Sequence, residues 1–175
     1  ETMPADAWPK VRAARVRLFH LIFQTPHLDW LLLTKRPEHM TRHIADVMNI
    51  AWFVPQVESP FAVWVEGWLT NHAVPQNVWL GTSVENQAAA DERIPHLLRT
   101  PAAVRFLSCE PLLGPLDLFN DRRNWLTPIG VVGRKPVQGG IGWCIVGGES
   151  GPGARPCDIE WIRSLVAQCR AAAVP

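Results

Sequence analysis

The sequence IGWCIVGGESGPGARP occupies residues 141–156 and decides the fold class. It starts with an apolar run of strand length, from Ile141 to Val146, and ends in two glycines, a carboxylate, a hydroxyl and an arginine. A helical pattern begins directly afterwards at Asp158. A buried strand that leads through a polar tip into a helix is a β/α unit, and ligands of α/β proteins bind at the carboxyl ends of the strands. We therefore expect this tip to belong to a ligand site.

Earlier parts of the chain repeat the same pattern. Further strands are predicted over residues 28–34, 77–83 and 103–108, and the unbroken apolar run of the first is typical of a strand covered on both faces. Helices are predicted over 8–24, 37–48, a stretch that follows the capping residue Asn86, and 158–173. We expect Pro95 to interrupt or restart the third of these helices. The first helix should bury one face, formed by Val11, Ala14, Leu18, Leu21 and Ile22.

The fold class that follows is α/β, with mainly parallel β/α repeats. Strands that alternate with helices predict a parallel sheet with right-handed crossovers. The 175 residues allow one domain with a real core, but a complete eight-stranded barrel typically needs about 250. We therefore expect residues 1–175 to form a single β/α domain.

Composition restricts the partners and the compartment. The net charge of +1 gives no overall field that would attract nucleic acid, and no apolar run approaches the roughly 20 residues of a membrane span. We expect a cytoplasmic protein that does not bind a membrane. Its cysteines should be reduced and mostly buried, with no metal site in this chain, and they are Cys109, Cys144, Cys157 and Cys169.

Two segments break the β/α pattern. Residues 49–76 form a Trp-rich insertion with one short helix expected near 61–69, and its tryptophans either pack against the body or form a platform for stacking a base. Residues 120–140 form a basic loop rich in glycine and proline, which either is solvated or meets phosphate. Its cations are Arg122, Arg123, Arg134 and Lys135.

Polar side chains recur at the ends of all the predicted strands. Parallel strands bring their carboxyl ends to one edge of the sheet, so these residues should form a common mouth for a small-molecule ligand. A hydroxyl and a carboxylate recur together on the last three tips. The candidate residues are Thr34, Lys35, Arg36, Ser83, Glu85, Ser108, Glu110, Gly147, Gly148, Glu149, Ser150 and Arg155.

These residue types leave two interpretations open. Carboxylates that lie close together raise each other's pKa unless a cation separates them. Lys35 and Arg36 either supply that cation and form an internal ion network with the glutamates, or they bind the carboxylate or phosphate of a ligand. In the second case the glutamates bind a metal or the amino group of the ligand. The Gly147 and Gly148 pair likewise either lets the backbone approach a ligand or makes a tight turn.

The chain resembles the bacteriophage gene-product 37/68 family, a family of uncharacterised function. The matching segments are LLLTKRPEHM at 31–40, the long stretch from NVWLGTSVENQ to LLGPLDL at 77–118, and GWCIVGGESGPGARP at 142–156 with the helix that follows. The family resembles radical S-adenosylmethionine (SAM) enzymes, which implies a partial TIM-barrel-like architecture and a segment of clustered cysteines for an iron–sulfur cluster. This sequence has no such segment, so the resemblance implies a barrel fragment without its cluster-binding start and its last strand.

The resemblance also implies a role for the tip at 147–149. A Gly-Gly-Glu element of radical SAM enzymes binds the methionine amino group, and Gly147-Gly148-Glu149 is similar to it, although it follows the last strand here and an early strand there. The leading hypothesis is thus a barrel-like enzyme that uses SAM and a cluster in the full-length protein. The alternatives are a non-catalytic phage or host module that binds protein or nucleic acid, and a hydrolase in which the glutamates hold a metal.

Overall fold

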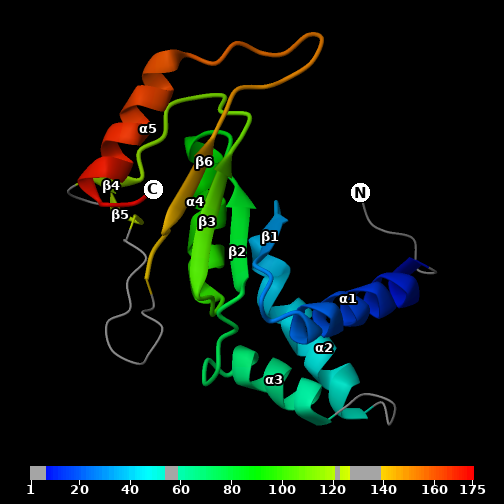
Figure 1. Ribbon diagram of the computed structural model, residues 1–175. Helices are drawn as coiled ribbons and strands as arrows, with labels where there is room; N and C mark the ends of the chain where they lie inside the picture. Colours follow the sequence, from blue (N-terminus) through cyan, green and yellow to red (C-terminus); the bar gives the residue numbers. More distant parts are fainter. Residues whose placement is uncertain (1–6, 54–58, 121–122, 127–138) are drawn as a thin grey trace.

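A four-stranded parallel sheet forms the centre of the molecule (Figure 1). The computed structural model describes residues 7–53, 59–120, 123–126 and 139–175. The strands are β1 (Trp30–Thr34), β2 (Val78–Ser83), β3 (Val104–Cys109) and β6 (Trp143–Val146), and they lie in the order β1-β2-β3-β6. Every neighbouring pair is parallel. This confirms the α/β class and places the strands side by side in the order of the chain.

Helices separate the strands along the chain. The helices are α1 (Ala7–Gln24), α2 (Met40–Phe53), α3 (Ser59–Leu69), α4 (Gln87–Arg99) and α5 (Ile159–Ala171), with a short 3₁₀ turn, η1 (Pro37–His39), before α2. A small antiparallel pair, β4 (Phe119–Asn120) and β5 (Arg123–Asn124), lies apart from the main sheet. Within the described ranges, no helix is long and apolar enough to cross a membrane.

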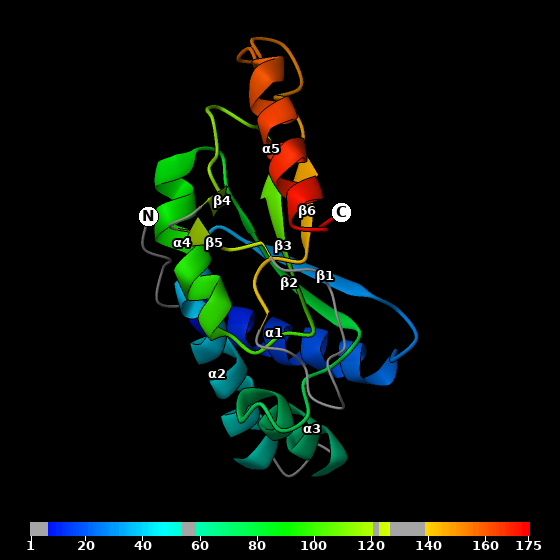
Figure 2. The same ribbon diagram turned by 90° about the vertical axis from the view of Figure 1, so that its left-hand side faces the viewer.

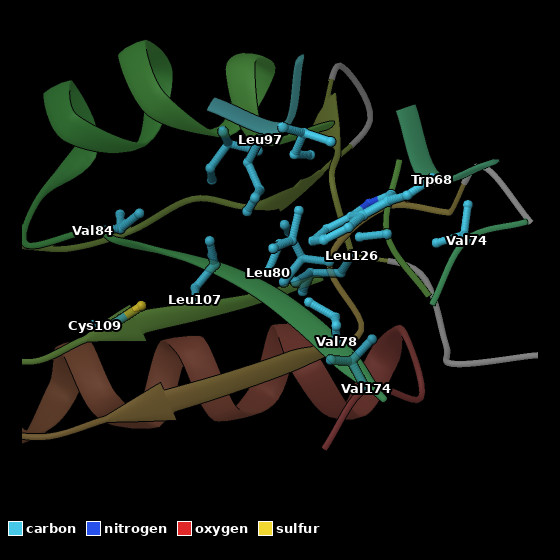
Figure 3. Packing of buried hydrophobic residues seen from close by; sticks show 14 of the residues in the cluster. Trp68, Val74, Val78, Leu80, Val84, Leu97, Leu107, Cys109, Leu126 and Val174 are labelled. Carbon is cyan, nitrogen blue, oxygen red and sulfur yellow. The ribbon is translucent and has the colours of Figure 1, made fainter. Parts of the chain in front are cut away.

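One face of the sheet packs against helices. The register places Leu32 beside Leu80, and Thr82 beside Leu107, so alternate side chains share this face. Leu80 and Leu107 point from the sheet toward the side where Leu97 of α4 lies (Figure 3), and all three are at most 2% exposed. Full burial of each such leucine stabilises the fold by about 1.5–3 kcal/mol. The hydrophobic core therefore lies between the sheet and its helices.

The opposite face of the sheet is open at β1. Leu31 and Leu33 are 43% and 50% exposed, so the expectation that this strand is covered on both faces is wrong. Figure 2 shows α4 on one side of the sheet, and no described helix covers the other side of β2, β3 and β6. A continuous apolar run cannot distinguish a doubly covered strand from an edge strand with one open face.

An aromatic cluster lies on this open face. Phe106 is 2% exposed because its ring lies over Gly81, its neighbour in the register, and contacts Trp143 at a centroid distance of 5.9 Å. Trp143 in turn meets Trp79 edge to face at 5.5 Å. A Cβ atom on Gly81 would lie 2.4 Å from the Phe106 ring. Glycine is thus required at 81 by close packing across the strands.

Two helices differ from the sequence-based expectation. In α1, Phe19 and Ile22 are buried while Leu21 is 47% exposed, because Phe19 stacks on Trp68 at 5.4 Å and sets the rotation of the helix. Helix α4 continues through Pro95. Packing of the fully buried Ile94 and Leu97 offsets the roughly 3 kcal/mol that an internal proline costs.

The caps are as the sequence indicates. The Asn86 side chain accepts a hydrogen bond from the Ala89 amide at 3.0 Å, and the Asp158 side chain accepts one from the Glu160 amide at 2.9 Å. Each satisfies an amide that the first helical turn leaves without an internal partner. Helices α4 and α5 therefore both start directly beyond the polar segment that follows a strand.

Part of the Trp-rich segment packs into the body, whereas its Trp52 and Phe53 are 45% and 82% exposed. Its first residues continue α2 as far as Phe53, and the short helix expected near 61–69 is α3. Trp68 is 1% exposed and donates its indole hydrogen to the Pro101 carbonyl at 2.8 Å, and half-buried Trp64 meets it edge to face at 5.7 Å. Neither ring is free to stack a base. Of the basic loop, Arg122, Arg134 and Lys135 lie outside the described residues.

The contact at Gly81 gives a stability prediction. Gly81→Ala should lower the free energy of unfolding by about 1–3 kcal/mol, because the added methyl group forces the Phe106 ring out of its position. Urea denaturation measures this change. Gly114→Ala is the matched control, since a Cβ there would meet only Asn86 at an ordinary 3.7 Å. Equal stability of both variants would contradict the packing account, as would the absence of any rescue when Gly81→Ala is combined with Phe106→Leu.

Candidate functional site at the strand tips

The carboxyl ends of the strands meet at one edge of the sheet. The register aligns Thr34 with Thr82, and Ser83 with Ser108. Beyond the strands, the Val84 amide donates to the Ser108 carbonyl at 2.9 Å and the Gly147 amide donates to the Cys109 carbonyl at 3.3 Å. These bonds extend the strand pairing into the tips, which all lie at the upper end of the sheet in Figure 1.

Glu85 lies between two cations. Lys35 Nζ is 2.6 Å from Glu85 Oε1, and Arg93 Nη1 is 2.8 Å from Oε2. Arg93 also donates to the Ser83 carbonyl at 2.9 Å, which fixes the guanidinium against the tip of β2. The Glu85 side chain is 12% exposed. The pairing joins the tip of β1 to the tip of β2 and to helix α4.

The charges around Glu85 determine its protonation. Burial raises the pKa of this carboxyl, but the hydrogen bond from Lys35 and the charges of Arg93 and Lys35 outweigh burial and hold the pKa below its ordinary value. The carboxylate is therefore ionised and internally paired at neutral pH. This corresponds to the internal ion network that the sequence left as one of two interpretations for Lys35.

Arg93 is a member of this network that sequence reasoning missed. It lies in the second turn of α4, and this helix begins just after the tip that carries Glu85. An arginine eight positions after a tip carboxylate, on the first turns of the following helix, can point back over the strand end. That spacing is the signal in the sequence that could have identified it.

Glu149 has a separate partner. Arg155 donates to it from Nε and Nη2, both at 2.7 Å, and from its backbone amide at 2.8 Å. The side-chain hydrogen bond from Arg155 is the main cause that lowers the pKa of Glu149 to about 2. The loop between them turns at Gly151 and Gly153, whose φ angles are +94° and +77°. Because the carboxylate is already paired, it does not present a free acceptor to an amino group.

The two ion pairs lie within electrostatic reach of each other. The pKa of Arg155 is raised first by the hydrogen bond to Glu149 and, more weakly, by the charge of Glu85. The loop after β6 therefore approaches the tip of β2. Each carboxylate nevertheless has its own cations.

Gly147 and Gly148 make room for neighbouring side chains. A Cβ atom on Gly147 would lie 2.9 Å from Glu110 Oε1, and one on Gly148 would lie 3.3 Å from the Cβ of Cys157. Glu110 itself is exposed and precedes a cis peptide bond to Pro111. The close approach of Glu110 to this backbone brings the tips of β3 and β6 together.

The remaining candidate residues differ in how accessible their side chains are. Thr34 accepts a hydrogen bond from the Arg36 amide at 3.0 Å, and both residues line a groove beside β1. Ser83 is 5% exposed, Ser108 is half-buried and Ser150 is exposed. Glu110, Arg36 and Ser150 are exposed at this edge, and so is Lys35, although its Nζ is paired with Glu85.

The cysteines do not form a cluster site. All are free, and Cys144 on β6 is hydrogen-bonded to Cys169 on α5. Burial raises the pKa of the Cys109 thiol to about 12, so it stays protonated and is a poor metal ligand. Among the residues that the structure describes, no group of three or more His, Cys, Asp or Glu could hold a metal ion. An iron–sulfur cluster does not fit these cysteines.

The fold and the tips define an α/β protein with one parallel sheet, whose charged and polar groups share the carboxyl edge. Residues 9–175 match the family described as protein of unknown function (DUF5131), and the chain belongs to this family. No curated protein and no solved structure matches the chain.

The Glu85 network gives a pH-dependent prediction. At neutral pH, Glu85→Gln should lower the free energy of unfolding by about 1–3 kcal/mol, because it leaves Lys35 and Arg93 without their carboxylate. The folded-state pKa of Glu85 is lowered, so its contribution is complete above the ordinary value of 4.5 and is lost as the pH falls through the lowered pKa. Urea denaturation at a series of pH values should show the two proteins converging in acid.

The control for this series is Glu92→Gln on the exposed side of α4, which should stay within about 0.5 kcal/mol of the natural sequence. An undiminished difference between Glu85→Gln and the natural sequence in acid would contradict the network.

Proposed function

We propose that this chain is the ligand-binding part of a β/α-barrel enzyme that resembles radical SAM proteins. The observation that carries the proposal is the strand order. Parallel strands that follow one another in space as they do in the chain are typical of a barrel, whereas doubly wound sheets reverse their order at a switch point. The resemblance to the bacteriophage gene-product 37/68 family is part of the same proposal.

The open face of the sheet supports a barrel-like arrangement. In a barrel, one face of every strand points to the interior and carries bulky apolar side chains. Phe106, Trp79 and Trp143 occupy the corresponding face here, and Leu31 and Leu33 continue it at β1. The strand tips would then form the mouth above this interior.

The accessible groups at the tips suit a zwitterionic ligand. Glu110 offers a carboxylate to an ammonium or sulfonium group, while Arg36 offers a cation to a carboxylate. SAM carries all three kinds of group, and it supplies radical chemistry when an iron–sulfur cluster reduces it. The described cysteines would not hold that cluster. This chain would bind and orient SAM through Glu110 and Arg36.

The two alternatives have less support. A carboxylate site for a hydrolytic metal would need glutamates that are free, and the cations around Glu85 and Glu149 already occupy them. An aromatic docking surface would need several exposed rings, but Trp68 is buried and Trp64 half-buried, although Trp52 and Phe53 at the end of α2 are 45% and 82% exposed.

Calorimetry with SAM tests the proposal. The protein should bind SAM, and Glu110→Gln should weaken the affinity about tenfold, which corresponds to loss of one charge-assisted hydrogen bond. The matched control is Glu66→Gln on α3, an exposed carboxylate at the opposite end of the sheet (Figure 1), which should leave the affinity unchanged. Absence of SAM binding, or equal affinity of Glu110→Gln and Glu66→Gln, would overturn the proposal.

A further inference from the structure

Two free thiols meet between strand β6 and helix α5. Cys144 is half-buried on β6, and Cys169 is 7% exposed near the end of α5. The Cys144 thiol donates a hydrogen bond to the Cys169 sulfur. A disulfide requires two cysteines whose side chains point toward each other. This pair therefore already has the orientation that a disulfide needs.

The strand register directs Cys144 toward α5. Its register partner on β3 is Leu107, whose side chain faces the helices (Figure 3). Residues that lie beside each other in register point to the same face of the sheet, so Cys144 also points to the helix side. Helix α5 runs beside β6 in both Figure 1 and Figure 2. The contact between the two thiols thus follows from the packing of a regular strand and a regular helix.

The end of α5 is tied to the same strand. The Val174 amide donates to the Cys169 carbonyl at 2.8 Å, and Ala173 turns the chain with a φ of +54°. The Cys144 amide then donates to the Pro175 carbonyl at 3.0 Å. The segment after Cys169 therefore returns to β6 beside Cys144. A short hydrogen-bonded turn keeps the two cysteines together.

The hydrogen bond gives the two thiols different reactivity. It is the main cause that lowers the pKa of Cys169 below its ordinary value, and together with burial it raises the pKa of Cys144. A thiolate attacks an oxidant, whereas a protonated thiol does not. Cys169 is therefore the nucleophile of the pair, and Cys144 lies beside the sulfur that becomes oxidised.

The other two cysteines are less well placed. Cys109 is fully buried, and burial raises the pKa of its thiol to about 12. Its register partner is Val146, so it lies two residues, or roughly 7 Å along the strand, beyond Cys144. Cys157 lies before α5 begins, and its thiol donates to the Asp158 carbonyl at 3.9 Å.

We propose that Cys144 and Cys169 form a redox-sensitive pair that a peroxide converts into a disulfide. The Cys169 thiolate attacks one oxygen of hydrogen peroxide, the O–O bond breaks, and the other oxygen leaves as hydroxide and takes up a proton to become water. The Cys144 sulfur then attacks the sulfenic acid on Cys169, and its proton leaves with the hydroxide as a second water. Two thiols are thus oxidised by two electrons, and one peroxide is reduced to two water molecules.

The disulfide would enclose the tip of β6. The chain from Cys144 to Cys169 contains the loop that the ion pair between Glu149 and Arg155 closes. A cross-link prevents α5 from separating from β6, so the two ends of this segment open less often. The oxidation state of the pair would therefore control how rigid this tip is. The inference concerns the contact between β6 and α5 and does not rest on the proposed SAM site.

Peptide mapping of the folded protein tests the pair. After treatment with hydrogen peroxide, the remaining thiols are alkylated and the protein is digested with trypsin. Trypsin cuts after Arg163 and Arg170, so it releases Cys169 in a short peptide. Mass spectrometry should find this peptide joined by a disulfide to the peptide that contains Cys144, and dithiothreitol should separate them. In protein oxidised in urea, Cys169 should instead link to all the other cysteines without preference.

Variants identify the partner of Cys169. Trypsin does not cut between Arg155 and Pro156, so Cys144 and Cys157 stay in one peptide. Cys144→Ala should abolish the link in the folded protein, whereas the matched control Cys157→Ala should keep it. Circular dichroism checks the fold of each variant, and the mapping of the natural sequence does not depend on either.

Hydrogen exchange measured by NMR tests the effect of the disulfide. After oxidation, exchange should slow at least about tenfold at the amides of Cys144 and Val174, because their hydrogen bonds break when the end of α5 leaves β6. Dithiothreitol should restore the original rates.

The proposal fails on any of three results. One is a Cys169 that stays unlinked in the folded protein while it is unmodified or oxidised to sulfinic acid. Another is the same mixture of links in folded and urea-treated protein. The third is unchanged exchange at Cys144 and Val174 after the link has formed.

Discussion

The parallel register of the sheet is the constraint on which the rest of the structure depends. With β1, β2, β3 and β6 in chain order, alternate residues such as Leu80 and Leu107 point toward the helices, and the residues between them, such as Phe106, point to the open face. A shift of one strand by a single residue would exchange the two sets. The buried core, the aromatic cluster and the meeting of the tips all require this one register.

Charge at the carboxyl edge follows from the same constraint. The register brings the residue after β1 next to the residues after β2, so Lys35 reaches Glu85 without distortion. Lys35 and Arg93 neutralise Glu85, and Arg155 neutralises Glu149, so Glu110 and Arg36 are the exposed charged groups of the tips outside these pairs. A partly buried carboxylate with two cations is stable because hydrogen bonds and charge outweigh its desolvation.

The sequence predicts the class, the strands and the common edge because these depend on local patterns. Apolar runs, the caps at Asn86 and Asp158 and the alternation of strands with helices are all short-range signals. What the sequence cannot provide depends on contacts between distant residues. The exposed side chains of Leu31 and Leu33 reflect what lies beyond β1, and the rotation of α1 is set by the stacking of Phe19 on Trp68.

The partners of the side chains at the strand tips are a second feature that the sequence cannot provide. The sequence identifies Lys35 and Glu85 as candidates for one site, but the competition between a ligand and Arg93 is decided by the position of α4 over the strand end. Similarly, the Gly147 and Gly148 pair suggests a ligand cradle, whereas Glu110 and Cys157 occupy the space beside it. In both cases the sequence identifies the residue type but not the side chain that lies beside it.

Cross-strand nuclear Overhauser effects test the central claim most directly. The account predicts parallel-strand contacts that link Leu32 with Leu80, Gly81 with Phe106, and Leu107 with Cys144. An antiparallel pattern between any of these strands, or a register displaced by one residue, would contradict it, because the tips and the two faces of the sheet would then be composed of different side chains.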